Sequence, residues 1–137
     1  MPQHRDKPRF IQLNNIGSPQ LGYITVLQHP ENIHFTVKRV FWTYFTPNHI
    51  VRGCHAHLKL KEVLVAVHGS VDVRLENIRG DHLHFKLDNP DKGLYVPPYH
   101  WFKLKFSHDA VLLTFANIKY DEKEYIRDYK KFKKLKV

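Results

Sequence analysis

The sequence predicts an all-β domain that ends in one α-helix. The chain has about ten short runs of alternating or β-branched residues, with Gly, Pro and Asn turns between them, and one helical pattern near its C-terminus. Because no helical segment separates the strands, an antiparallel sandwich or barrel is favoured over an α/β fold. A length of 137 residues fits one domain spanning residues 1–137.

The N-terminal third is expected to contribute three strands. Residues 9–15 and 22–28 form short strands around a turn at Gly17, Ser18 and Pro19. Residues 35–45 form a longer one, in which Arg39 needs an anionic partner because the strand is otherwise apolar. One face of this strand carries Val37, Arg39, Phe41, Thr43 and Phe45. The other face carries Lys38, Val40, Trp42 and Tyr44.

The middle of the chain continues as strands. Residues 62–68 are apolar on both faces, which is typical of a strand buried on both sides. Residues 70–76 and 82–87 alternate between apolar and polar side chains, so each should have one face in the core and one in water. Further strands are predicted at 94–96, 101–106 and 110–116.

A helix is predicted over about residues 121–133. Asp121 is a suitable N-cap and Glu124 follows three residues later, a variant of the capping box. Three aromatic residues at i, i+4 and i+7 would lie on one helix face and pack on the barrel: Tyr125, Tyr129 and Phe132. We interpret this helix as a structural cap.

Composition limits the partners. No apolar run approaches a membrane span, the N-terminus lacks the apolar stretch of a signal peptide, and Cys54 is the single cysteine, so we expect a cytoplasmic protein without membrane contact. The formal charge is +9, but six basic residues lie at 127–136, where a solvated helix face explains them better than a nucleic-acid groove. A small phosphorylated ligand would also suit a basic protein.

The most informative motif is a pair of histidines. His55 and His57 are two residues apart on an expected strand, so their side chains lie on one face and share a pocket. With Glu62 and Gly69 they match the spacing His-x-His-x4-Glu-x6-Gly, the first motif of the cupin β-barrels. Imidazole and carboxylate groups could bind a metal ion or transfer protons.

The second cupin motif is incomplete. Metal-binding cupins place another histidine after Gly-x5-Pro, and in register this position holds Phe102. His100 lies two residues earlier and could partly replace the missing ligand. A metal-dependent enzyme using His55, His57 and Glu62 therefore stays an alternative.

Five segments that together extend over most of the chain carry a family likeness: residues 37–44, the Arg-Gly-Cys-His-Ala-His block 52–57, and residues 63–70, 93–98 and 120–129. In these segments the chain resembles the cupin-type nucleoside-diphosphate-sugar 3,4-ketoisomerases, the WxcM-like family. The likeness implies a homodimeric cupin jelly roll (double-stranded β-helix) that works without a metal or cofactor. The implied reaction moves the ketone of a dTDP-linked 4-keto-6-deoxyglucose from C4 to C3. Two residues depart from the family pattern, Glu62 for Gln and Leu58 for a basic residue.

The residues suit this chemistry, which needs proton transfer but no net redox change. One of His55 and His57 would move the carbon-bound proton and the other the oxygen-bound protons. Donors for the enediolate oxygen are expected from Tyr44 and Arg52, although a core role for Tyr44 and a salt bridge or diphosphate contact for Arg52 are alternatives. The predicted substrate contacts are Arg39 for phosphate, Glu62, and Trp101 for stacking on the base or sugar. A noncatalytic sugar-nucleotide-binding cupin is the second alternative.

Overall fold

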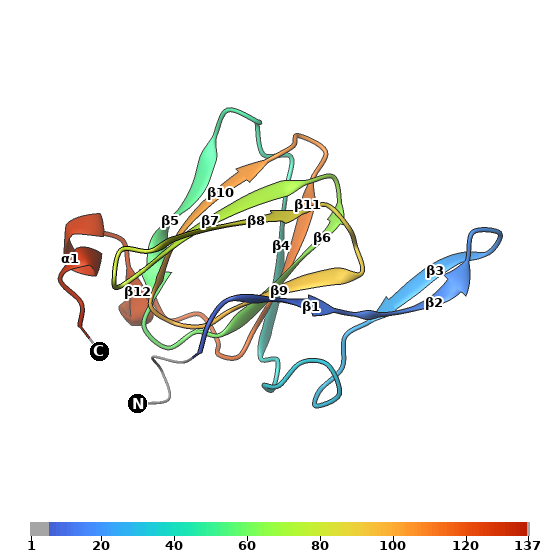
Figure 1. The fold of residues 1–137 in the computed structure, drawn as a ribbon, viewed down its shortest axis with the longest axis horizontal. Coiled ribbons are helices and arrows are strands. Elements are labelled where there is room, and N and C mark those ends of the chain that lie inside the picture. Colours follow the sequence, from blue (N-terminus) through green and yellow to red (C-terminus); the bar gives the residue numbers. More distant parts are fainter. Residues whose placement is uncertain (1–5, 137) are drawn as a thin grey trace.

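The protein is a β-barrel of two five-stranded sheets with a hairpin projecting from one side (Figure 1). The computed structural model describes residues 6–136, so residues 1–5 and 137 of the predicted domain lie outside the described residues. Its strands are β1 (Arg9–Gln12), β2 (Asn14–Ser18), β3 (Gly22–Val26), β4 (Arg39–Tyr44), β5 (Val51–His57), β6 (Glu62–His68), β7 (Val71–Asn77), β8 (His82–Leu87), β9 (Lys92–Val96), β10 (His100–Phe106), β11 (Val111–Ala116) and β12 (Tyr125–Ile126).

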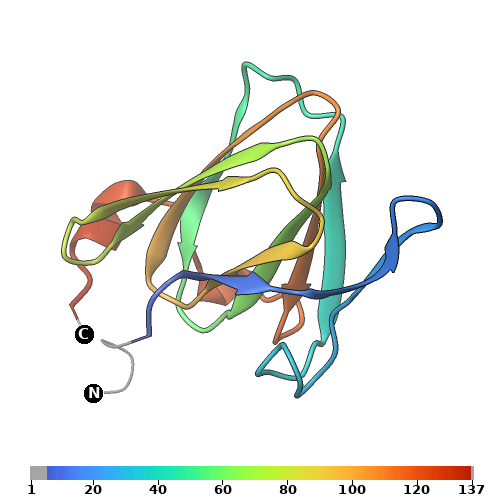
Figure 2. The ribbon, with the colours of Figure 1, turned by 45° about the vertical axis from the view of Figure 1, so that its right-hand side comes forward.

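All paired strands are antiparallel. The first sheet has the order β1-β9-β6-β11-β4, the second has the order β12-β5-β10-β7-β8, and β2 pairs with β3 in the separate hairpin. Figure 2 shows the two sheets facing each other around the interior of the barrel. This arrangement confirms the predicted all-β cupin jelly roll.

The interior is filled by alternate residues of both sheets, as expected for strands with one face in a core. The main cluster contains Leu64, Ala66, Val71, Val73, Leu75, Leu87, Leu94, Val96, Phe102, Phe106, Ala110 and Leu112. A second cluster lies on the outer face of the first sheet, where Leu13 and Ile33 cover Val63, Val65 and Tyr95. The N-terminal segments therefore shield the outer side of β6 and β9.

Most predicted strands agree with the structure, and two have the predicted bounds, residues 62–68 and 82–87. The long segment 35–45 forms a shorter strand, β4, which begins at Arg39 and ends before Phe45, where the left-handed conformation (φ 57°) interrupts the extended backbone.

The C-terminal helix is the main correction. In place of one helix over 121–133, the chain forms a 3-10 turn, η2 (Glu122–Glu124), then the short strand β12, then the helix α1 (Tyr129–Lys133). β12 pairs with the outer edge of β5, which supplies backbone partners that a continuous helix would not use. Tyr129 and Phe132 pack on Trp101 as a structural cap, whereas Tyr125 lies elsewhere. Among residues 6–136, no helix has the length and apolar character needed to cross a membrane.

Candidate active site

A bulge in β5 presents the two histidines. Gly53 and Cys54 both have positive φ (86° and 56°), and the pairing with β10 shifts there, so Cys54 is an extra residue in β5. Beyond the bulge His55 lies opposite Phe102, whose side chain belongs to the interior cluster. His55 and His57 therefore face the barrel interior.

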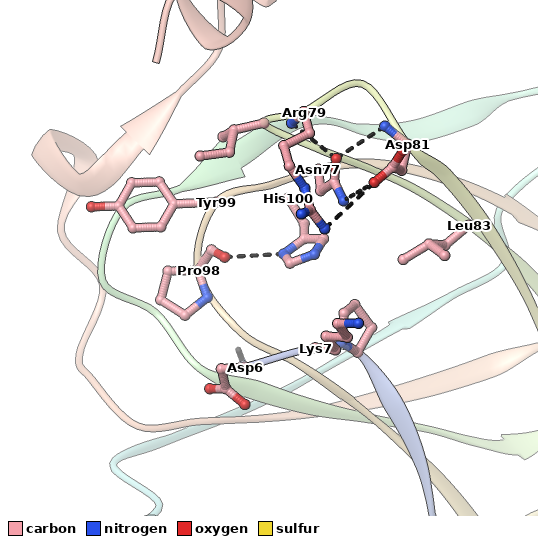
Figure 3. A pocket seen from close by; sticks show the side chains of 11 residues that line it. Asp6, Lys7, Asn77, Arg79, Asp81, Leu83, Pro98, Tyr99 and His100 are labelled. Carbon is pink, nitrogen blue, oxygen red and sulfur yellow. Dashed lines mark hydrogen bonds and ion pairs between the residues drawn. The ribbon is translucent and has the colours of Figure 1, made fainter. Parts of the chain in front are cut away.

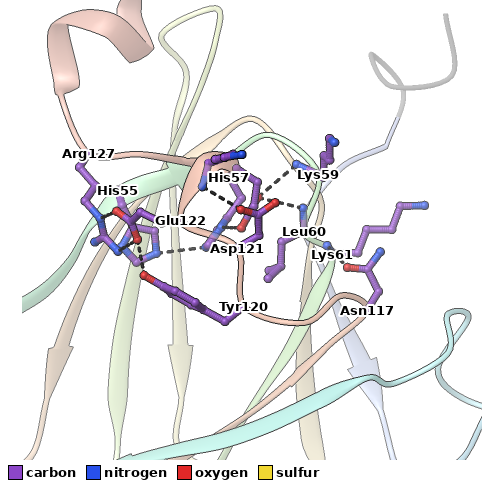
Figure 4. Close-up of polar contacts among 12 residues, drawn as sticks. His55, His57, Lys59, Leu60, Lys61, Asn117, Tyr120, Asp121, Glu122 and Arg127 are labelled. Atoms are coloured by element: carbon purple, nitrogen blue, oxygen red, sulfur yellow. Dashed lines mark hydrogen bonds and ion pairs between the residues drawn. The ribbon is translucent and has the colours of Figure 1, made fainter.

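The histidines belong to one chain of hydrogen-bonding groups (Figure 4). Nδ1 of His55 lies 3.0 Å from the carbonyl oxygen of Gly53, and Nε2 of His55 lies 3.1 Å from Nε2 of His57. Nδ1 of His57 lies 2.6 Å from Oε1 of Glu124. The other oxygen of Glu124 accepts hydrogen bonds from the backbone N–H groups of Lys59 and Leu60, both at 3.3 Å.

These hydrogen bonds determine how many protons the imidazole rings of His55 and His57 hold. The carbonyl oxygen of Gly53 can only accept, so Nδ1 of His55 carries a proton. The carboxylate of Glu124 likewise accepts a proton from Nδ1 of His57. A hydrogen bond between the two Nε2 atoms then needs exactly one further proton between them. The two rings together therefore hold three ring protons and one positive charge, which Glu124 balances.

Burial and neighbouring charges set the ionisation of His55 and Glu124. Burial, and then the charge of His57, lower the pKa of His55 to about 4, so His55 is the neutral member of the pair at neutral pH. For Glu124 burial opposes ionisation, but the hydrogen bond and charge of His57 outweigh it and the pKa of Glu124 is lowered. With its own proton on Nδ1, neutral His55 has a free base at Nε2, facing His57.

Aromatic and charged residues from the C-terminal segment cover the pair. The ring of Tyr125 lies 5.2 Å from the ring of His55 and 4.5 Å from that of His57, between centroids. The guanidinium of Arg127 lies 4.5 Å above the ring of Tyr125 and is paired with Glu122. Glu122 also accepts a hydrogen bond from the hydroxyl of Tyr120. This segment closes the barrel beside the histidines.

Glu62 and Arg39 share the barrel interior with the histidines. The carboxyl of Glu62 is 5% exposed; burial raises its pKa, while the nearby charges of His57 and Arg39 lower it. Arg39 has no ion pair among the described residues, and its Nε atom is enclosed without a hydrogen-bond partner. The anionic partner expected for Arg39 is therefore not supplied by a carboxylate within bonding distance.

Two predicted site residues lie away from the histidines. Tyr44 belongs to the face of β4 opposite to Phe41 and Thr43, and it is 54% exposed. Trp101 lies on the outer face of β10 and is 6% exposed, with its ring 5.3 Å from that of Tyr129. Strand parity turns both side chains away from the interior, so the structure does not bring Tyr44 and Trp101 together with the two histidines.

Arg52 lies nearer the open end of the same strand. It is opposite Leu104, which packs against the interior cluster, so Arg52 also projects from the inner face of β5. Its side chain is exposed and makes no ion pair within residues 6–136. A cation in this position is free to meet an anionic part of a ligand.

His100 does not join the histidine pair. It lines a separate recess of about 260 Å³ with Asp6, Arg79, Asp81 and Leu83, and its Nδ1 donates to the carbonyl oxygen of Pro98 at 3.0 Å (Figure 3). Within residues 6–136, no three His, Cys, Asp or Glu side chains are grouped so that they could hold a metal ion. The trio of the metal alternative, with or without His100, is therefore not assembled as a ligand set.

Glu124 and Tyr125 were missed as site residues. In the sequence Glu124 has the position of a helix-capping residue, 67 residues from His57, and Tyr125 that of a packing residue of the helix. One signal for a site role was available in the sequence: Glu124 and Tyr125 both lie in block 120–129, which carries part of the family resemblance. Nothing in local spacing connects that block to β5.

Comparison with known proteins places this geometry among sugar-nucleotide isomerases. Residues 6–137 match the family model described as FdtA, WxcM-like, C-terminal. A TDP-4-oxo-6-deoxy-alpha-D-glucose-3,4-oxoisomerase of Aneurinibacillus thermoaerophilus is 41% identical over 115 residues, covering 82% of this chain and 81% of that protein.

Solved structures give the same relationship. QdtA of Thermoanaerobacterium thermosaccharolyticum, a sugar 3,4-ketoisomerase in complex with TDP, has a TM-score of 0.88 and 33% identity, covering 93% of this chain and 92% of that one. WlaRA of Campylobacter jejuni, a TDP-fucose-3,4-ketoisomerase, has a TM-score of 0.87 and 34% identity, covering 95% and 96%.

Proposed function

Because this chain belongs to the FdtA family, the WxcM-like C-terminal type, we propose that it is a sugar-nucleotide 3,4-ketoisomerase. The substrate is dTDP-4-keto-6-deoxy-D-glucose and the product a dTDP-3-keto-6-deoxyhexose, a suitable precursor of deoxyaminosugars. The observation that supports this activity best is the buried chain from Glu124 through His57 to His55, which holds one mobile proton beside one free base.

The reaction exchanges two hydrogens between neighbouring positions. The hydrogen on C3 moves to C4, and the hydroxyl hydrogen on O3 moves to O4, so no electrons leave the sugar. A base and an acid that act together and then exchange roles are sufficient. In the proposed resting state His57 is the acid and neutral His55 is the base, an assignment supported by the hydrogen bonds of the two rings and by the lowered pKa of His55.

In the first step His55 removes the C3 proton through Nε2 while His57 gives its Nε2 proton to the keto oxygen at C4. A neutral enediol forms, and the positive charge of the pair moves from His57 to His55. Loss of the charge on His57 removes a cause of the lowered pKa of His55, so donation by one ring makes the other a stronger base.

In the second step His55 returns its proton to C4 and His57 takes the hydroxyl proton from O3. The ketone is now at C3, and both rings regain their initial protonation states. Glu124 keeps His57 in position and balances its charge in the resting enzyme. General acid–base groups of this kind contribute roughly 10²–10⁴-fold in rate.

Other residues are assigned to binding. Arg52, exposed and without an ion pair among the described residues, lies on the inner face of β5 and is assigned to the diphosphate; because Cys54 is bulged, its backbone is about 7 Å from that of His55, the length of two strand residues. Tyr125 forms an apolar wall beside both rings and supports their orientation. The partner molecule is thus a dTDP-linked keto-deoxysugar, without a metal or cofactor.

We also propose a cytoplasmic homodimer. β4 is an edge strand whose outer face is apolar, and the hairpin β2–β3 projects away from the barrel (Figure 1). Large side chains are exposed on both elements, on the hairpin Leu21 (89%), Tyr23 (58%) and Ile24 (66%), and on β4 Val40 (45%), Trp42 (58%) and Tyr44 (54%). An apolar surface of this kind on an unpaired edge fits a second copy of the chain better than water.

Product analysis tests the activity. Incubation of the purified chain with dTDP-4-keto-6-deoxy-D-glucose should convert it to a 3-keto isomer of the same mass, identified by its carbon-13 spectrum. Unchanged substrate, together with intact binding of the sugar nucleotide, would support the noncatalytic alternative instead.

A further inference from the structure

Arg39 and Glu62 flank one small residue of the barrel interior. In the first sheet Ala116 of β11 lies directly opposite Arg39 of β4 on one side and Glu62 of β6 on the other. Residues directly opposite one another share a face of the sheet, so the three side chains project together into the interior. Neighbouring strands are about 4.8 Å apart, which places the backbones of Arg39 and Glu62 about 10 Å apart across the methyl group of Ala116.

Among the described residues, the polar groups of both long side chains lack hydrogen-bond partners, although the guanidinium of Arg39 lies 5.1 Å and 5.7 Å from the ring centroids of Phe41 and Tyr120. Within residues 6–136, Glu62 makes no recorded hydrogen bond or ion pair although it is 5% exposed, and Nε of Arg39 is fully enclosed without a partner. Buried polar groups are normally hydrogen-bonded, and each exception costs about 1–3 kcal/mol.

The surroundings select the chemistry of a ligand. Arg39 only donates hydrogen bonds, whereas the carboxyl of Glu62 accepts them and, when protonated, also donates one. The neighbours Ala116 and Val96 are 0% and 1% exposed and offer no polar group to a doubly charged diphosphate. Burying that charge against one cation and one acid would be costly, but a neutral hydroxyl or keto group can satisfy both residues.

We propose that Arg39 and Glu62 form a subsite over Ala116 that binds ring oxygens of the hexose, and that Ala116 determines which sugars fit. This assignment rests on the proposed function and replaces the expected contact of Arg39 with phosphate. The position agrees with it, because Glu62 lies close enough to His57 and Glu124 to feel their charges. In this assignment Arg52 remains the residue that contacts the diphosphate.

Binding measurements on matched variants test the subsite. Calorimetry would compare dTDP with dTDP-glucose, which carries the ring oxygens but has no ketone to react, on the wild type, Glu62→Leu and Glu62→Gln. Leu removes both hydrogen-bonding functions at similar volume, whereas the amide of Gln keeps a donor and an acceptor. We expect Glu62→Leu to weaken dTDP-glucose about 10- to 100-fold and to leave dTDP within about twofold, and Glu62→Gln to bind both nearly as the wild type does.

A second variant addresses Ala116 itself. Ala116→Val adds two methyl groups where the hexose oxygens would lie, and it should also weaken dTDP-glucose selectively. Equal weakening of dTDP and dTDP-glucose in Glu62→Leu would mean that the pair binds the diphosphate and would overturn the proposal. The same holds if the wild type binds dTDP-glucose no better than dTDP, or if Glu62→Leu changes neither affinity.

Failure of the proposed function would look different. If the chain does not isomerise dTDP-4-keto-6-deoxy-D-glucose but Glu62→Leu still loses dTDP-glucose selectively, the subsite stands and the isomerase assignment falls.

Discussion

Nδ1 of His57 lies 2.6 Å from Oε1 of Glu124, and the two side chains are 4% and 2% exposed. A carboxylate in this position orients the imidazole and stabilises its charged form, as an orienting acid does for a catalytic histidine. Glu124 touches no reacting atom in the proposed mechanism, so it is a positioning residue.

Glu124→Gln should lower kcat about 100-fold and change KM little. The variant removes the charge that balances His57, and its amide nitrogen cannot accept from the backbone N–H groups of Lys59 and Leu60. Steady-state kinetics over a range of pH measures the effect, and the profile should shift along the pH axis because His57 loses its counter-charge. The exposed Glu122→Gln is the matched control. An equal decrease of kcat in both variants would show that the carboxylate of Glu124 has no specific role in catalysis.

The pH dependence of stability should reveal His55. Its pKa is lowered from about 6.5 in the unfolded chain to about 4 when folded. Between these values the unfolded state binds the additional proton, so folding stability decreases as pH falls from about 6.5 to 4. The Tm of the wild type and of His55→Asn should therefore be measured across this pH interval. As the pH falls, the Tm of the variant should decrease less than that of the wild type. Parallel curves would contradict a buried, neutral His55.

Trp101 should be structural. Trp101→Leu removes part of a buried aromatic cluster with Tyr129 and Phe132, so the free energy of unfolding should fall by about 2 kcal/mol while KM for the sugar nucleotide is unchanged. Phe132→Leu, in the same cluster, is expected to behave alike. A large increase in KM for Trp101→Leu alone would restore the stacking role that the sequence predicted.

The dimer is tested by placing a charge on the apolar face of β4. Trp42→Glu should shift the sedimentation mass from dimer to monomer, because a carboxylate would be buried against the second copy. Lys86→Glu is the control, because it also places a carboxylate on a strand surface, on the exposed side of β8, and it should leave the mass unaltered. A wild-type monomer, or a Trp42→Glu dimer, would contradict the proposal.

The strands were predictable because alternation reports burial directly, and residues 62–68 and 82–87 have the predicted bounds. The parity of β4 also placed Arg39 and Tyr44 on opposite faces, so both could not belong to one pocket. The C-terminal segment was not predictable in the same way. Its spacing fits a helix, but the unpaired edge of β5 and the rings of His55 and His57 give Tyr125 a better place in an extended strand.

Solvent exchange in D2O tests the paired histidines most directly. The proton that His55 takes from C3 exchanges with solvent at Nε2 while the enediol is bound, so the wild type should convert dTDP-4-keto-6-deoxy-D-glucose into a 3-keto product that carries deuterium at C4. His55→Asn and His57→Asn should each slow this incorporation at least about 100-fold, and the double variant should be no slower than the poorer single one, because residues that act as a unit are not additive. Incorporation at the wild-type rate in either single variant, or losses that multiply in the double variant, would contradict the shared-proton mechanism.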